Sequence, residues 1–127
     1  MSAAYLDTHV AIWLHAGKLE KLTNDAKREI EGRSLLISPT VFLELQYLYE
    51  IKRVKFPPSK IFADLTGSLG LAMCSLPYPA IAVAATDLAW TRDPFDRLIV
   101  AHAMVNHNAK LITADERIRS NYSNAVW

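Results

Sequence analysis

Five acidic residues of this chain stand at positions where carboxylates can act together. Two lie three residues apart at the start of a predicted helix, two directly follow short apolar segments, and one interrupts the apolar face of a helix. The five acids are Asp7, Glu44, Asp93, Asp96 and Asp115. Carboxylates gathered at one place repel one another unless a cation neutralises them. Because Mg²⁺ prefers oxygen ligands and takes one or two direct carboxylates, the set predicts a magnesium site, provided that the fold brings the acids together.

Such a site suits phosphodiester chemistry. A pair of magnesium ions about 3.5–4 Å apart orients and activates water for in-line attack on a phosphate. Hydroxyl groups beside the acids can orient the carboxylates or hold bound waters. Thr8, Ser38 and Thr113 are the candidates for this supporting role. Ordinary capping and turn chemistry is the alternative explanation for all three.

The acids near predicted helix starts also have a structural explanation. Asp93 occupies an N-cap position before Pro94, and Asp96 lies at the third helical position, where a negative charge favours the helix dipole. We expect Asp93 to cap the helix and Asp96 to point into the site. Asp7 and Asp115 can likewise cap the helices that follow them.

Glu44 is harder to explain by local structure alone. On a helical wheel it lies between Val41 and Leu48, on the stripe that faces the core. A lone carboxylate there is costly unless it is paired or bound to a metal. A structural pair with an arginine, or a position at the edge of the stripe, is the alternative. The metal hypothesis therefore rests on the set of acids and not on any single member.

Basic side chains cluster in sequence around the acids. They can contact the phosphates of a nucleic acid beside the metal. Alternatively, they balance the acids through salt bridges, and Arg97 in particular can pair with a carboxylate. These residues are Arg92, Arg97, Lys110, Arg117 and Arg119.

The histidines and the first tryptophan are expected to be structural. The four histidines share no zinc-like spacing, and His102 lies within a predicted helix, where it is expected to be packed. Three aromatic residues, Trp13, Tyr47 and Tyr49, could line a groove for a partner, although as core residues they need none. Of these, Trp13 is expected to belong to the core.

Strands and helices alternate along the whole chain, and this alternation must position the acids. The predicted strands are residues 3–6, 35–37, 71–74 and 110–113, with a possible fifth at 125–127. The predicted helices are residues 10–15, 26–31, 39–53, 60–68, 77–90 and 94–106, of which 77–90 is expected to be mostly buried. The strands are continuous apolar runs, which indicates a parallel sheet covered on both faces. We therefore predict one domain over residues 1–127, an α/β fold of the three-layer α/β/α kind with a central parallel sheet of four to five strands.

In such sheets, binding sites lie outside the carboxyl ends of the strands. Asp7, Ser38 and Asp115 all follow the carboxyl ends of predicted strands, and Glu44 and Asp96 lie on helices near those ends. The rule for the fold and the positions of the acids therefore agree.

Composition narrows the class of protein without naming a partner. The chain has 127 residues, of which 51% are hydrophobic, and its net charge is +1, so any nucleic acid must bind to a local patch. Cys74 is the single cysteine, which excludes an intrachain disulfide and fits the reducing cytoplasm. The first residues lack the pattern of a signal peptide or a membrane span.

Four segments of the sequence together resemble one family. They are Tyr5–Leu14 (YLDTHVAIWL), Ser38–Leu45 (SPTVFLEL), Arg92–Ala103 (RDPFDRLIVAHA) and Leu111–Asp115 (LITAD). In this order they resemble the PIN domain and, more narrowly, the VapC-type toxins of toxin–antitoxin pairs. The resemblance covers almost the whole chain, and DPFDRL is its most specific string.

The resemblance implies an endoribonuclease that depends on Mg²⁺ or Mn²⁺. In the family three acids bind metal, and they correspond here to Asp7, Glu44 and Asp96. A fourth acid often follows the last strand, where Asp115 stands, and Asp93 matches an extra acid of the DPFD subgroup. The resemblance also implies an RNA substrate, a homodimer, and a small antitoxin whose C-terminal segment lies across the active-site groove.

Two other classes of protein remain as alternatives. In an Asp-based phosphatase or phosphotransfer domain Asp7 would be the nucleophile, but the second acid that the phosphatase usually carries two residues later is His9 here. In a non-catalytic PIN-like binding module the acids would be helix caps and no divalent ion would bind. Nucleotide-binding enzymes are poorly supported, because no glycine-rich loop follows the first strand.

Overall fold

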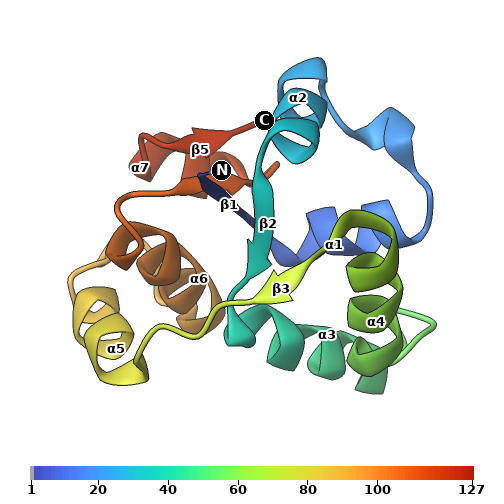
Figure 1. The fold of residues 1–127 in the computed structure, drawn as a ribbon. Coiled ribbons are helices and arrows are strands. Elements are labelled where there is room, and N and C mark those ends of the chain that lie inside the picture. The colour runs from blue at the N-terminus through green and yellow to red at the C-terminus, as the bar shows by residue number, and fades with distance from the viewer. Residues whose placement is uncertain (1) are drawn as a thin grey trace.

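A single parallel sheet of five strands forms the centre of the protein, which was obtained as a computed structural model describing residues 2–127 (Figure 1). The strands are β1 (Ala3–Leu6), β2 (Ser34–Ile37), β3 (Ala72–Met73), β4 (Lys110–Ile112) and β5 (Ala125–Val126). They follow the order β3-β2-β1-β4-β5, and every neighbouring pair is parallel. The predicted parallel sheet is confirmed, including its fifth strand.

The first strand occupies the middle of the sheet. Ala4, Tyr5 and Leu6 are fully buried, as expected for an apolar run covered on both faces. In the register of the pairs, Ala4 lies opposite Lys110 of β4 and Leu35 of β2. The residue that follows β1 therefore emerges between the carboxyl ends of its two neighbours.

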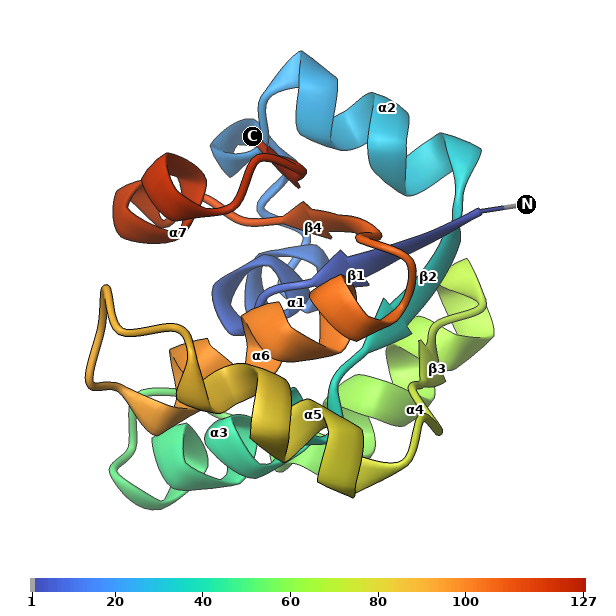
Figure 2. The ribbon, with the colours of Figure 1, turned by 90° about the vertical axis from the view of Figure 1, so that its left-hand side faces the viewer.

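Helices cover both faces of this sheet. Figures 1 and 2 show α5 and α6 against one face and α1 and α4 against the other, which confirms the predicted layered α/β arrangement. The helices are α1 (Thr8–His15), α2 (Asn24–Gly32), α3 (Pro39–Glu50), α4 (Pro58–Leu69), α5 (Tyr78–Thr86), α6 (Pro94–Val105) and α7 (Glu116–Asn121), with a short 3₁₀ turn η1 at Leu19–Lys21. Within residues 2–127, none of them is long and apolar enough to cross a membrane.

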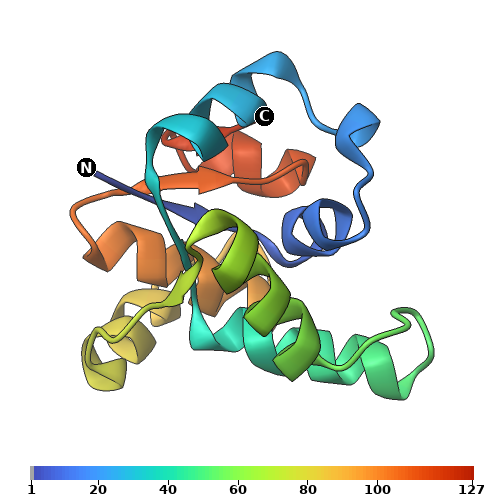
Figure 3. The ribbon, with the colours of Figure 1, turned by 45° about the vertical axis from the view of Figure 1, so that its right-hand side comes forward.

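The end of α3 differs from the sequence prediction. The helix was expected to reach residue 53, but it ends at Glu50. Lys52 adopts a left-handed conformation, with φ of 62°, and the backbone N–H of Arg53 donates to the carbonyl of Leu48 over 2.8 Å. This is a Schellman-type ending that satisfies the last carbonyls of the helix. The chain then leaves the helix in a turn-rich segment, residues 51–57, which projects from the body of the protein (Figure 3).

The prediction for residues 77–90 was wrong in two respects. The helix α5 ends at Thr86, and only Ile81 and Ala85 within it are buried. Its alanine-rich composition suggested burial on all sides, but α5 packs against α6 with one face and leaves Tyr78 and Val83 exposed.

Candidate active site

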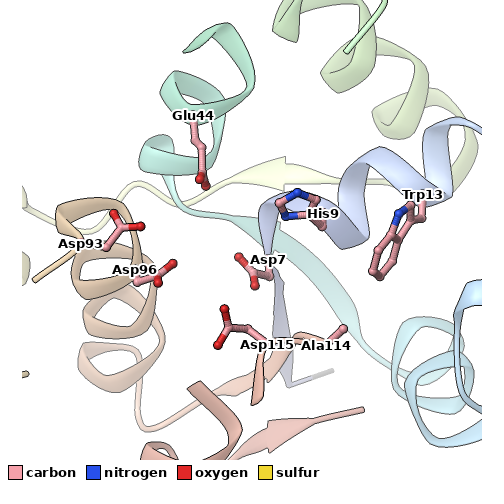
Figure 4. A pocket seen from close by; sticks show the side chains of 8 residues that line it. All are labelled: Asp7, His9, Trp13, Glu44, Asp93, Asp96, Ala114 and Asp115. Atoms are coloured by element: carbon pink, nitrogen blue, oxygen red, sulfur yellow. The ribbon is translucent and has the colours of Figure 1, made fainter. Parts of the chain in front are cut away.

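A cavity of about 330 Å³ opens beyond the carboxyl ends of the strands. Its lining residues are Asp7, His9, Trp13, Glu44, Asp93, Asp96, Ala114 and Asp115. All five acids singled out from the sequence belong to this cavity, although they come from four separate parts of the chain. Figure 4 shows their side chains around a common space. The sheet order explains the meeting, because β1 and β4 are neighbours and end at the same edge.

Asp7 is the most buried of these acids, with 8% of its surface exposed. One carboxylate oxygen accepts a hydrogen bond from the backbone N–H of Thr8 at 2.8 Å, so Asp7 caps α1. The other accepts from the hydroxyl of Thr113 at 2.6 Å. The backbone N–H of Asp7 donates to the carbonyl of Ile112 in β4. Asp7 therefore has both its backbone and its side chain fixed by the two central strands.

Glu44 reaches the cavity from the core-facing side of α3. Its carboxylate accepts a hydrogen bond from the hydroxyl of Thr8, whose side chain is itself buried. The arginine pair that offered a structural explanation for Glu44 is absent from residues 2–127. Thr8 thus links the acid of α3 to the end of β1, as the supporting role predicted for its hydroxyl requires.

The two acids of α6 have separate roles, as expected. Asp93 is exposed and caps the helix by accepting from the backbone N–H of Phe95 at 2.9 Å. Asp96 lies in the first turn of α6, is half-buried, and is directed into the cavity (Figure 4).

Asp115 follows β4 and combines a capping role with a place in the cavity. Its side chain accepts from the backbone N–H of Ile118 at 3.0 Å and caps α7, while its own N–H donates to the Thr113 hydroxyl at 3.0 Å. Thr113 therefore touches both Asp7 and Asp115. This agrees with the position expected of a hydroxyl that orients the acids.

Burial and mutual repulsion raise the pKa values of three of these acids. Burial raises the pKa of Asp7, and the hydrogen bonds from Thr113 and Thr8 act in the opposite direction. Burial, followed by the negative charges of Asp7 and Asp93, raises the pKa of Glu44. For Asp96, burial and the charges of all four neighbouring acids raise the pKa to about 7. Such strongly perturbed carboxylates in a cavity are characteristic of functional sites.

Within residues 2–127, no cation forms an ion pair with these acids. Across residues 2–127, no lysine, arginine or histidine nitrogen lies within 4 Å of a carboxylate oxygen of the five. Arg92 instead donates to the carbonyl of Ala89, and Arg97 donates to the carbonyl of Thr91, each over 2.8 Å. The alternative in which these arginines balance the acids as salt bridges is therefore excluded for the described residues.

The set of donors suits a hard divalent cation. Oxygen atoms of carboxylates surround the space, and the charges of the other four acids all raise the pKa of Asp96. In residues 2–127 no three Asp, Glu, His or Cys side chains already form a compact metal-binding group. An open arrangement matches Mg²⁺, which retains several of its waters and needs few direct carboxylates.

Ser38 lies apart from the acids. Its hydroxyl accepts from the backbone N–H of Thr40 and caps α3, and it forms a 2.8 Å hydrogen bond with Nδ1 of His102 in α6. His102 is buried, as predicted, and burial lowers its pKa. The pair ties the helix that carries Glu44 to the helix that carries Asp96, so Ser38 acts on the site only through those helices.

Three lining residues, His9, Trp13 and Ala114, were not among the predicted site residues. His9 was expected to be structural. Trp13 was expected to belong to the core, with a groove for a partner as the alternative, and it lines the cavity beside the acids. Trp13 is half-buried and also packs against the core. The spacing of His9 and Trp13 could have placed them there from the sequence. Residues four apart lie on one face of a helix, and the helix α1 directly follows Asp7.

The family-model comparison now identifies the fold and its family. Residues 4–123 match the model of the PIN domain. The chain belongs to the PIN-domain family. The match covers all five acids and four of the five strands of this PIN domain, and it confirms the resemblance noted in the sequence.

Solved structures support the same fold. VapBC2 from Rickettsia felis, bound to a DNA fragment from its promoter, aligns with a TM-score of 0.65 and 19% identity over 98% of this chain and 96% of that one. A toxin–antitoxin complex from Klebsiella pneumoniae gives 0.63 and 18%, and DNA-bound VapBC from Salmonella typhimurium gives 0.60 and 18%, both over 98% of this chain and 96% of theirs. At such identities the likeness establishes the fold. No curated protein sequence matches the chain.

Proposed function

We propose that this PIN domain is a metal-dependent endoribonuclease, the toxin of a VapC-type toxin–antitoxin pair. The observation that carries the proposal is the cavity with five carboxylates, none of which forms an ion pair within residues 2–127. A site of this kind has little use in a folded protein unless a cation enters it, because the acids destabilise one another. The fold shared with VapBC complexes supports the toxin assignment.

Four acids, Asp7, Glu44, Asp96 and Asp115, would hold Mg²⁺ or Mn²⁺. The bound ion supplies an activated water and stabilises the charge that develops on the phosphate. Thr113 and Thr8 hold the carboxylates of Asp7 and Glu44 in place through hydrogen bonds, so these acids need little reorganisation on binding. Asp93 sets the start of α6 and adds negative charge at the rim of the site.

Contacts with the RNA backbone fall to the basic side chains near the cavity. Arg117 in the first turn of α7 is exposed two residues after Asp115, and Arg92 is exposed next to Asp93. Arg97 is half-buried and uses its Nε to bind a carbonyl, which leaves its terminal amino groups for a phosphate. These contacts position the strand and carry no sequence information.

A small antitoxin and a second copy of the chain are the proposed protein partners. Two of the three solved structures named above are described as VapBC and the other as a toxin–antitoxin complex. By analogy, an antitoxin would bind this chain and block access to the acids. Formation of a homodimer is the expectation drawn from the family.

The decisive experiment replaces single acids and measures RNA cleavage with Mg²⁺ or Mn²⁺ present. Asp7→Asn and Asp96→Asn should each lower cleavage by at least about 100-fold, because losing a direct ligand should exceed the 10–100-fold typical of outer partners. Asp87→Asn is the matched control, since Asp87 is exposed and outside the cavity. Full activity of both cavity variants, shown to be folded by circular dichroism, would refute the nuclease assignment.

A non-catalytic PIN-like module is the second candidate, because Asp7, Asp93 and Asp115 do serve as helix caps. It predicts that calorimetric titration with Mn²⁺ gives no binding heat. The phosphotransfer alternative is disfavoured by geometry. Both carboxylate oxygens of Asp7 already accept hydrogen bonds, which weakens them as nucleophiles.

A further inference from the structure

One wall of the acid cavity is aromatic, and the carboxylate chemistry gives it no role. His9 and Trp13, both on α1, line this wall, and Figure 4 shows His9 between the acids and Trp13. We propose that this aromatic wall binds an unpaired nucleobase by stacking, next to the phosphate held at the acids. The proposal rests on the ribonuclease function proposed above and defines its substrate as a single-stranded segment of RNA.

The two rings are presented together by the helix. Their four-residue spacing places them on one face of α1, with ring centroids 6.1 Å apart and planes tilted by 50°. His9 is exposed, and within residues 2–127 no carboxylate oxygen lies within 4 Å of its ring nitrogens. The imidazole is therefore not held by an ion pair.

Trp13 is held in place by neighbours that do not line the cavity. Its ring packs against Trp127, with centroids 5.7 Å apart and planes tilted by 49°. The ammonium group of Lys21 lies 5.4 Å from its ring centroid, in cation–π contact. Packing against the core fixes the rest of the side chain. A ring immobilised in this way loses little conformational freedom when a base stacks on it.

The chemistry of the wall favours an unpaired base over a protein segment. Bases of single strands stack on aromatic side chains, whereas the faces of bases within a duplex are already covered. Lys21 adds a positive charge beside the wall, which attracts a phosphate of the same strand. The base and the reacting phosphate would then belong to neighbouring nucleotides.

Binding of a short fluorescein-labelled oligoadenylate to the full chain tests the inference directly. Ca²⁺ replaces Mg²⁺, and gel analysis confirms that the RNA stays intact. Trp13→Leu should weaken binding about tenfold, within the range measured for loss of a single base stack, and His9→Ala about threefold. Trp13→Phe retains an aromatic ring and should bind nearly as well as the parent.

An abasic scan of the same RNA distinguishes stacking from a general loss of structure. At one position, removal of the base should weaken binding to the parent about tenfold and change binding to Trp13→Leu little. Tyr49→Leu serves as the control, because Tyr49 is an exposed aromatic outside this cavity. His9→Ala tests the same wall without the risk of misfolding, because His9 is exposed and its replacement leaves the core unchanged.

Three outcomes would overturn the inference. The first is that Trp13→Leu binds RNA as tightly as the parent while the parent still cleaves RNA, which removes the stacking role and leaves the nuclease intact. The second is that, at every position, removal of the base weakens binding to Trp13→Leu as much as binding to the parent. The third is that Trp13→Leu binds RNA as the parent does but no longer binds the proposed antitoxin, which assigns the wall to a protein partner. Absence of RNA binding by the parent would instead contradict the proposed function itself.

Discussion

The two ends of the central sheet carry cavities that differ sharply in how their charges are satisfied. At the carboxyl end, about 330 Å³ is lined by five acids without a partner cation in residues 2–127. At the amino end lies a cavity of about 430 Å³. Its lining residues are Ser2, Ala3, Arg33, Asn106, His107, Asn108, Ala109 and Lys110.

The polar groups at the amino end are largely paired with one another. Arg33 donates to Glu29 and to the hydroxyl of Ser2, and the side chain of Asn106 donates to the hydroxyl of Tyr5 at 2.9 Å. The same sheet therefore has one end where Arg33 forms an ion pair with Glu29, and one end where none of the five carboxylates forms an ion pair within residues 2–127. The crowding of unpaired carboxylates at the carboxyl end favours a ligand there.

Of the tests that compare the two ends of the sheet, the addition of metal should give the largest change in stability. Mn²⁺ at about 100 times its Kd should raise the free energy of unfolding by about 3 kcal/mol, because only the folded chain gathers the acids. Asp96→Asn should lose most of this gain, while Arg33→Gln, at the amino end, should keep it. Thermal unfolding with and without Mn²⁺ measures both. Equal stabilisation of the parent and Asp96→Asn would contradict the assignment of the acidic end as the metal site.

The pH dependence of the metal-free protein gives the next largest effect. The pKa of Asp96 rises from 3.8 to about 7 on folding, so the folded chain holds this proton more tightly than the unfolded chain. Its contribution to stability is complete below about pH 4 and is lost as the pH rises through about 7. Allowing for its partial exposure, we expect a loss of roughly 2 kcal/mol between pH 5 and pH 8.

Urea unfolding in chelator at several pH values checks this prediction. Asp96→Asn should be more stable than the parent at pH 8 and should show a flatter profile. A parent protein whose stability stays as constant over this pH range as that of the variant would show that Asp96 ionises without cost.

A smaller effect is expected from the hydroxyl that orients the acids. Thr113→Val removes the hydrogen bond to Asp7 and should lower Mn²⁺ affinity about tenfold, in the range found for outer partners of metal ligands. Thr66→Val is the control, because the Thr66 hydroxyl bonds a carbonyl away from the cavity. Calorimetric titration distinguishes the two, and equal affinities would mean that Asp7 needs no support from Thr113.

The smallest effect should come from the amino end. Arg33→Gln breaks the pair with Glu29, and loss of a partly exposed i,i+4 pair should cost about 0.5 kcal/mol in unfolding free energy. Mn²⁺ affinity and RNA cleavage should remain at the parental level. A marked loss of cleavage would mean that the two ends of the sheet are coupled.

Much of the acidic end could be predicted from sequence, and the reasons are physical. Buried parallel strands are continuous apolar runs, so β1 and β4 were visible together with the acids that end them. Helix caps have strong residue preferences, so the starts of α3 and α6 were found at Ser38 and Asp93. The rule for binding sites in parallel sheets then brought the acids to one edge.

Other features depend on packing that leaves no mark in the sequence. Lys52 ends α3 in a conformation usually taken by glycine, so no residue announced the stop. The alanines of α5 gave no indication of which face would be exposed. Trp13 is equally suited to a core and to a cavity wall, and only its position beside the acids distinguishes them.

The central place of β1 in the sheet has a consequence for synthesis of the protein. Asp7 is translated before β4, and β1 cannot pair with β4 until residues 110–112 have left the ribosome. Glu44 is translated before Asp96 and Asp115. A nascent chain therefore carries separate acids and no assembled cavity. For an enzyme proposed to cut RNA, this order of assembly keeps the ribosome that makes it away from a competent active site until the segment that carries Asp115 has been made.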